Sequence, residues 1–200
     1  HYKIFDYIIL PSYEPYKVKP ASKNQQIIRC FGLINYINQT FLEEKLKEYN
    51  SHSKYKFLRK LKLKPPYLNV IIGGKHTGGN VSTKDAKNII NATNNWLSKN
   101  NGTALITTSP RTEVKTAEYL AQNIKGSHFI YDYKKRETEN PYNVFLALAD
   151  QIIVTADSVR MLSESCSTGK QTYIYTPQQI GFQYPPLVSE LIENNYALKL

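Results

Sequence analysis

The chain has 200 residues, enough for one complete α/β domain and part of another. Lys and Arg number 26 against 16 Asp and Glu, and the formal charge of +10 favours anionic partners: phosphorylated small molecules, an acidic membrane surface or nucleic acid. Two cysteines exclude a disulfide-rich scaffold, and no apolar run approaches the roughly 18 residues of a membrane span. We therefore expect a cytoplasmic protein, at most peripheral at the inner face of the membrane.

The first 64 residues contain few regular elements. Apolar runs at 5–10 and 26–31 predict two strands. The segment that follows predicts a short amphipathic helix, with Thr40 as N-cap and Glu43 as its capping-box partner. These elements are too few to close a sheet of their own. We expect residues 1–64 to be the end of an incomplete N-terminal Rossmann-like domain and a linker, in a fragment of a longer protein.

Residues 54–64, KYKFLRKLKLK, are dense in lysine and arginine. They place Tyr55, Leu58 and Leu61 at helical spacing before two prolines end the segment. One interpretation is a solvated helix face or an interdomain linker. The other is contact with an anionic membrane surface or a phosphorylated acceptor, because a basic amphipathic helix lies readily on lipid headgroups. The sequence leaves both open.

From Tyr67 onward, strand-like and helix-like segments alternate. Strands are predicted at 68–74, 104–108, 128–131, 151–155 and 172–175. Helices are predicted at 83–99, 113–124, 142–149, 159–165 and 187–194. This alternation predicts an α/β fold for residues 65–200, a Rossmann-like parallel sheet of five strands with helices on both faces.

The first of these strands runs into a glycine-rich loop, GGKHTGG. Gly73 and Gly74 let backbone amides approach a ligand, and Lys75 adds a charge suited to phosphate. The spacing matches neither GxGxxG nor GxxxxGK[ST], which argues against a dinucleotide fingerprint and a P-loop. The loop predicts either contact with a phosphate or an acceptor, or simply a turn.

The second strand is followed by TTSPRT. Because carboxyl ends of parallel strands meet at one edge of the sheet, Ser109 and Arg111 are expected beside the glycine loop. A guanidinium at that place pairs with a diphosphate through two hydrogen bonds. The plainer alternative for Arg111 is a surface or helix-cap cation.

The stretch DQIIVTADSVRMLSESCSTGKQTYIY has the order strand, loop, helix, turn and strand, and it is our leading candidate binding site. Thr155 ends the strand, and Asp157 and Ser158 are expected to cap the helix, whose first N–H groups suit an anion. Met161 shares a helix face with Ser158, and Glu164 lies three residues after Met161. Helix capping is the plainer interpretation and does not exclude ligand contact.

Catalytic and metal motifs are sparse. The four histidines have no metal-ligand spacing with Cys, Asp or Glu, so no metal site is predicted. There is no GxSxG nucleophile elbow, and the catalytic residues stay unassigned. No aromatic and basic platform or recognition helix supports nucleic-acid binding, so no nucleic-acid partner is expected.

VTADSVRMLSESCSTGKQTYIY, together with GG after the first strand of the alternating region and TTSPRT after the second, resembles the mitochondrial-fission family known from plants and alphaproteobacteria. FDYIILPSYEPY and NQQIIRCFGLINYI are similar to the part of that family where its first domain ends. The family looks like glycosyltransferases of the GT-B architecture, two Rossmann-like domains facing across a cleft, and has also been labelled a nucleoside-diphosphate-sugar epimerase. The resemblance covers nearly the whole chain.

This resemblance implies a nucleotide-sugar-dependent glycosyltransferase that acts on a cell-envelope glycolipid or polysaccharide, with the nucleotide sugar as substrate and no cofactor. On matching positions, Ser158 and its neighbours would meet the diphosphate, and Glu164 would meet the ribose hydroxyls. The catalytic base of such enzymes usually comes from the first domain, so none is named. The alternative is a non-catalytic scaffold of the same fold that recruits protein or membrane partners.

Overall fold

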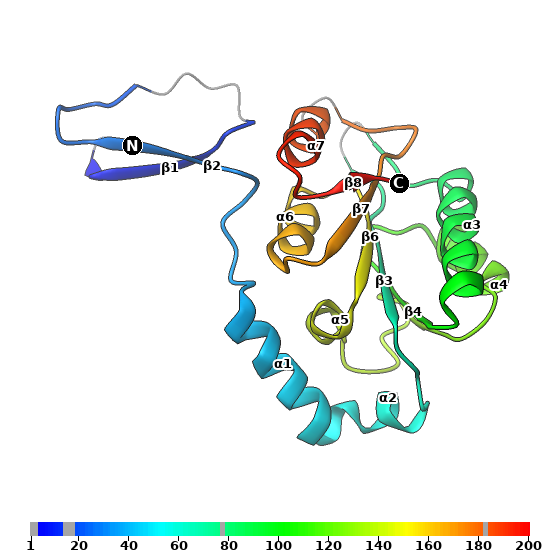
Figure 1. Cartoon of the computed structure of the whole chain (residues 1–200). Coiled ribbons are helices and arrows are strands. Elements are labelled where there is room, and N and C mark those ends of the chain that lie inside the picture. Colours follow the sequence, from blue (N-terminus) through cyan, green and yellow to red (C-terminus); the bar gives the residue numbers. More distant parts are fainter. Residues whose placement is uncertain (1–3, 14–18, 77–78, 182–183) are drawn as a thin grey trace.

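The computed structural model describes residues 4–13, 19–76, 79–181 and 184–200. Its centre is a sheet of six strands, all parallel, in the order β5-β4-β3-β6-β7-β8 (Figure 1). The strands are β3 (Tyr67–Ile72), β4 (Thr103–Thr108), β5 (His128–Tyr131), β6 (Gln151–Thr155), β7 (Gln171–Tyr175) and β8 (Leu198–Lys199). The predicted Rossmann-like α/β class is confirmed.

The sixth strand corrects the prediction of five. β8 consists of Leu198 and Lys199, which pair with Tyr173 and Ile174 of β7. Two residues are too few to show the alternation of apolar and polar side chains that identifies a strand in a sequence. Only the sheet edge offered by β7 makes this segment a strand.

Helices cover both faces of the sheet, as predicted. One face carries α3 (Thr83–Asn100) and α4 (Val114–Asn123), and the other carries α5 (Tyr142–Leu148), α6 (Val159–Ser167) and α7 (Tyr184–Glu193) (Figure 1). Successive side chains of β6 serve the two layers in turn: Ile153 packs with α3 and α4, and Ile152 and Val154 pack with α5, α6 and α7. Among the described residues, no helix is long and apolar enough to cross a bilayer.

The order of strands reverses between β3 and β6. From β3 the chain adds β4 and β5 on one side, then crosses to β6 and adds β7 and β8 on the other. In open parallel sheets, ligands bind beyond the carboxyl ends of the strands at such a reversal. Because β3 ends at Ile72 and β6 at Thr155, the loops after these two residues form the walls of the expected crevice.

Near the N-terminus, β1 (Tyr7–Pro11) and β2 (Gln26–Cys30) form a separate parallel pair that lies apart from the main sheet in Figure 1. The segment after β2 reaches the main body at Leu33, whose N–H donates to Ser163 Oγ at 2.8 Å. The predicted division of the chain at residue 64 stays a prediction.

The first helix begins slightly earlier than predicted, and its cap is a different residue. α1 (Gln39–Ser51) has Asn38 as N-cap, and the N–H of Phe41 donates to Asn38 Oδ1 at 2.9 Å. Thr40 lies inside the first turn, so its predicted capping role is wrong. Asparagine caps helices at least as well as threonine does, and the acceptor at Asn38 makes a second cap at Thr40 unnecessary.

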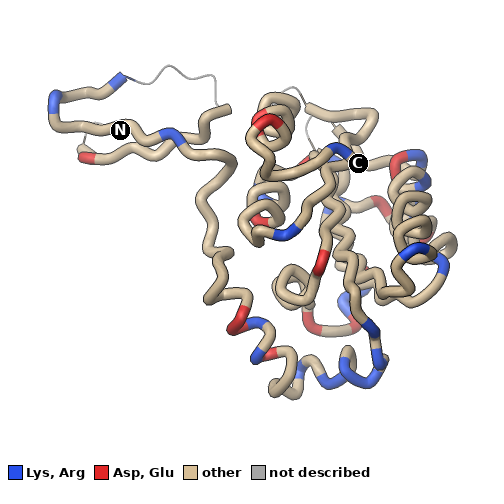
Figure 2. The backbone as a smooth tube through the Cα atoms, viewed as in Figure 1, with Lys and Arg blue, Asp and Glu red and all other residues tan. Residues whose placement is uncertain are grey.

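The basic segment 54–64 contains a shorter helix than predicted. It forms η2 (Ser53–Tyr55) and α2 (Lys56–Lys60). Tyr55 and Leu58 are buried against Phe145 of α5, whereas Leu61 is 49% exposed. Figure 2 shows Lys and Arg gathered on α2 and on the turn into β3. Most of the apolar face therefore packs on the protein body, whereas Leu61 stays exposed.

A buried carboxylate ties the start of α3 to the end of β7. Asp85 Oδ2 accepts hydrogen bonds from the N–H (2.8 Å) and the hydroxyl (2.6 Å) of Ser82, and its Oδ1 accepts from the Tyr175 hydroxyl (2.9 Å) and the Gln178 N–H (3.0 Å). Burial would raise the pKa of Asp85, but these hydrogen bonds outweigh burial and lower the pKa. The carboxylate also occupies the N-terminus of α3.

We expect Asp85→Ala to lower the free energy of unfolding by about 1–3 kcal/mol, because it leaves buried donors unpaired. Since the pKa of Asp85 is lowered in the folded state, its contribution is present above the unfolded value of about 4 and is lost as pH falls through the folded value. Urea denaturation of the two proteins at neutral and acidic pH measures the difference. Glu193→Ala, at an exposed position, is the control. A stability difference that does not shrink on acidification contradicts the assignment.

Candidate functional site

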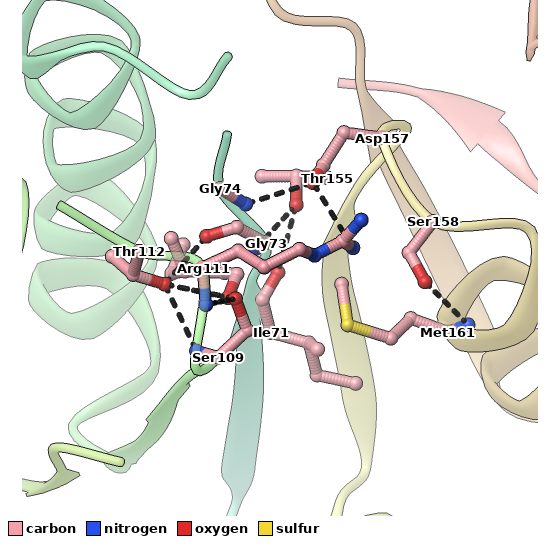
Figure 3. A network of polar contacts seen from close by, with 11 residues as sticks. Ile71, Gly73, Gly74, Ser109, Arg111, Thr112, Thr155, Asp157, Ser158 and Met161 are labelled. Carbon is pink, nitrogen blue, oxygen red and sulfur yellow. Dashed lines mark hydrogen bonds and ion pairs between the residues drawn. The ribbon is translucent and has the colours of Figure 1, made fainter. Parts of the chain in front are cut away.

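Two hydrogen bonds join the loops after β3 and β6 (Figure 3). The N–H of Gly73 donates to Thr155 Oγ1 at 2.8 Å, and the N–H of Gly74 donates to Asp157 Oδ2 at 2.8 Å. The structure thus brings these four predicted site residues together at the reversal of the sheet. Both glycine amides are engaged within the protein, so neither is a free donor for a ligand in this arrangement.

The glycines are required by close packing. A Cβ on Gly73 would lie 2.0 Å from Asp157 Oδ2, and a Cβ on Gly74 would lie 2.1 Å from the carbonyl oxygen of Arg111. Contacts that short do not occur between real atoms. The two glycines correctly predict that another group approaches the backbone closely, but the approaching groups belong to the protein itself rather than to a ligand. Thr77 and Gly78 of the same predicted loop lie outside the described residues.

Asp157 is a fully buried carboxylate and does not cap α6. The N-cap is Ser158, whose Oγ accepts a long hydrogen bond of 3.4 Å from the N–H of Met161. Burial raises the pKa of Asp157, and the hydrogen bond from Gly74 and the charge of Arg111 oppose that rise. Asp157 was expected to share the capping role with Ser158, but its side chain turns toward β3 instead.

Arg111 joins the same network from the loop after β4. Its Nη2 lies 3.7 Å from Asp157 Oδ2, and its side chain is 39% exposed. The Arg111 carbonyl accepts the N–H of Lys75 at 3.0 Å, which places the exposed Lys75 beside it. Figure 3 shows the guanidinium extending across the end of β6 toward the start of α6. The ion pair is long enough to leave the guanidinium able to bind a further anion.

A compact turn holds Arg111 in place. Ser109 Oγ accepts the N–H of Arg111 at 3.2 Å, and Thr112 Oγ1 accepts the N–H of Ser109 at 2.9 Å. The Thr112 hydroxyl also donates to the carbonyl of Gly73 at 2.5 Å. Ser109 therefore shapes the loop, and Thr112, which the sequence analysis did not select, fastens it to the glycine loop. In the sequence, the run of hydroxyl residues in TTSPRT indicates such hydrogen bonds.

Glu164 lies apart from this network, on the side of α6 that faces α5. It is 2% exposed; Oε2 accepts the Tyr142 hydroxyl at 2.8 Å and Oε1 accepts Arg160 Nε at 2.8 Å. A cavity of about 370 Å³ adjoins it, lined by Tyr36, Asn140, Tyr142, Asn143, Arg160, Met161 and Glu164. Met161 belongs both to the first turn of α6, where its N–H contacts Ser158, and to this cavity.

The partners of Glu164 differ in how far the sequence reveals them. Arg160 precedes Glu164 by four residues, a spacing that places an ion pair on one helix face. Tyr142 is 22 residues away on another helix, and nothing local indicates the contact. Burial, followed by the charge of Glu164, raises the pKa of Tyr142 well above its ordinary value, so this hydroxyl is a hydrogen-bond donor at neutral pH. Within the described residues, no group of three or more His, Cys, Asp or Glu is placed to hold a metal ion.

We expect Asp157→Ala to lower the free energy of unfolding by about 1–3 kcal/mol, because the buried N–H of Gly74 loses its acceptor. Asp157→Asn should cost less, since a neutral amide oxygen still accepts that N–H and no charge is buried.

The pH dependence supplies a second check on Asp157. A carboxyl whose folded pKa is raised gains stability as pH falls through that value toward the unfolded value of about 4. The wild-type protein should therefore gain stability relative to Asp157→Asn on acidification, the opposite sign to Asp85. Urea denaturation across that range measures it, and a relative loss would contradict the burial argument.

Comparison with known proteins identifies the family of the chain. The family described as "Mitochondrial fission ELM1" matches residues 1–200. An uncharacterized protein of Rickettsia prowazekii is 30% identical over 98% of this chain and 61% of its own length. The mitochondrial fission protein ELM1 of Arabidopsis thaliana is 26% identical over 87% of this chain and 43% of its own length. The chain thus spans less than two thirds of either relative, and no solved structure is significantly similar to it. The chain belongs to the mitochondrial fission ELM1 family.

Proposed function

We propose that this protein binds a nucleoside-diphosphate sugar beyond the carboxyl ends of β3 and β6 and acts as a glycosyltransferase of GT-B type. The observation that carries the proposal is the exposed guanidinium of Arg111, only loosely paired with Asp157, beside the start of α6. An Arg fork and a helix N-terminus are two of the commonest phosphate-binding groups in proteins.

The diphosphate is assigned to α6 rather than to α3 for an electrostatic reason. The first helix after the first strand normally receives the phosphate in dinucleotide-binding folds. Here a capping box with a carboxylate already occupies the start of α3: Asp85 Oδ2 accepts the N–H of Ser82, and Ser82 Oγ accepts the N–H of Asp85. At α6 the first-turn amides of Val159 and Arg160 have no partner within the helix, and Ser158 is a neutral cap. Lys75 would add a second cation on the opposite side of the crevice.

The ribose is assigned to the Glu164 pocket. A carboxylate accepts hydrogen bonds from two neighbouring hydroxyls and retains lone pairs after binding Tyr142. Tyr142 fixes the direction of the carboxylate, while Arg160, whose side chain is 68% exposed, would have to move aside for the ribose. In glycosyl transfer, Arg111 and the start of α6 would stabilise the charge that develops on the leaving diphosphate. Transfer of the sugar to a cell-envelope glycolipid or polysaccharide belongs to the same proposal, as does contact of residues 54–64 with an anionic membrane surface. No catalytic base is assigned.

Calorimetric titration with uridine, guanosine and adenosine diphosphates tests this assignment. We expect one of them to bind, and Arg111→Ala to weaken it roughly tenfold or more, because a hydrogen bond to a charged group contributes about 1.5–3 kcal/mol. Glu164→Gln should weaken binding of the nucleoside diphosphate, whose ribose is assigned to this side chain, but should leave binding of inorganic pyrophosphate unchanged. Lys87→Ala removes an exposed cation of α3 and should change nothing. Absence of binding by all three nucleotides in the wild-type protein would overturn the proposal.

A second candidate is a non-catalytic scaffold that recruits partners. The Arabidopsis relative is named for mitochondrial fission, and the β1 and β2 pair exposes Tyr7, Ile9 and Ile28. Glu164→Ala separates the two functions: it should abolish nucleotide binding in a glycosyltransferase, and it should leave partner recruitment intact in a scaffold.

A further inference from the structure

A groove runs along one edge of the main sheet, away from the crevice. β5 is the end strand, with no second neighbour among the described strands. A cavity of about 540 Å³ follows it from His128 to Asp132. α4 forms one wall with Ala117, Glu118 and Ala121, and Leu61 and the loop after β5 also line the cavity.

The floor of this groove is an unpaired strand edge. The carbonyl of Ser127 accepts the N–H of Ala104 in β4 at 3.0 Å. The backbone N–H and C=O groups of alternate residues point to the same side of a strand. The backbone groups of Phe129 and Tyr131 therefore also face β4, and the backbone groups of His128 and Ile130 face the groove. The strand HFIY has no proline or lysine, two residues that commonly protect an edge from pairing.

The side walls leave room for an extended chain. Ile130 packs into the core on the α3 and α4 face, and Phe129 packs against Phe145 on the other, so the edge itself stays open between the layers. Ala117 and Ala121 lie one turn apart on α4, and their small side chains widen the groove. An added strand would place alternate side chains over these alanines and over Leu61.

The charged side chains that line the groove favour one kind of occupant over another. Its lining contains Glu118, Asp132 and Glu137 against a single lysine, Lys135, in a protein whose formal charge is +10. A basic segment is therefore complementary to the groove. A second copy of the protein paired edge to edge would bring the same acidic side chains together, which like-charge repulsion disfavours.

We propose that the open edge of β5 docks an extended, lysine- or arginine-rich segment of a partner protein by strand addition. Backbone hydrogen bonds to His128 and Ile130 hold the segment, and Glu118 and Glu137 pair with its cations. The mode is that of other domains that lengthen a sheet with a bound peptide, in which main-chain bonds give affinity and side chains give specificity. This site is independent of nucleotide binding.

Fluorescence anisotropy with a labelled peptide of alternating lysine and valine tests the proposal on the whole chain. We expect this peptide to bind, and two other peptides to fail: one of alternating glutamate and valine, and one with N-methylated lysine–valine backbone amides. Ala121→Trp fills the groove from an exposed position and should weaken binding about tenfold or more. Glu118→Lys should weaken it about three- to fivefold, the range of an exposed ion pair.

Glu193→Lys makes the same charge change at the exposed end of α7 and should leave binding intact. Thermal melts of the variants show that each is folded. Equal binding of the N-methylated peptide, or equal loss in Glu118→Lys and Glu193→Lys, would overturn strand addition. If sedimentation shows a dimer that dissociates in Ala121→Trp, the occupant is a second copy of the protein instead, and the proposed basic segment is overturned.

Discussion

The buried carboxylate of Asp157 holds together the loops at the reversal of the sheet. A charge taken out of water is costly unless it is hydrogen-bonded and paired. Asp157 meets that requirement in part: its Oδ2 accepts the N–H of Gly74 and lies 3.7 Å from the guanidinium of Arg111, and these two residues come from the loops after β3 and β4. The absence of a side chain on Gly73 is a condition for the arrangement. One side chain therefore fixes three loops relative to one another.

The two buried carboxylates near this edge of the sheet have different consequences. Asp85 is held by four hydrogen bonds, which lower its pKa and keep a negative charge at the start of α3 at neutral pH. Asp157 has fewer partners, and burial raises its pKa. In the proposed function, this difference directs an anion away from α3 and toward Arg111 and the uncharged cap of α6, in the second half of the sheet.

Much of this fold can be read from the sequence, because alternating strands and helices leave clear periodic patterns. The two-residue β8 leaves no pattern, and the cap of α1 is missed because Asn38 and Thr40 are both acceptable caps. In the site, glycines at 73 and 74 indicate close contacts, but the residues that approach them, Asp157 and Arg111, lie far along the chain. The Tyr142 partner of Glu164 is likewise set by the packing of α5 on α6. Local patterns locate the candidate site, and long-range contacts decide what each residue does there.

Membership of the mitochondrial fission ELM1 family and the Rossmann-like sheet are established, and the central proposal is that an anion binds at the start of α6. Backbone amide NMR during titration with the nucleoside diphosphate that binds most tightly tests it directly. We expect the largest shifts at Val159, Arg160 and Arg111. Shifts concentrated instead at Ser82 to Asp85, at the start of α3, would contradict it.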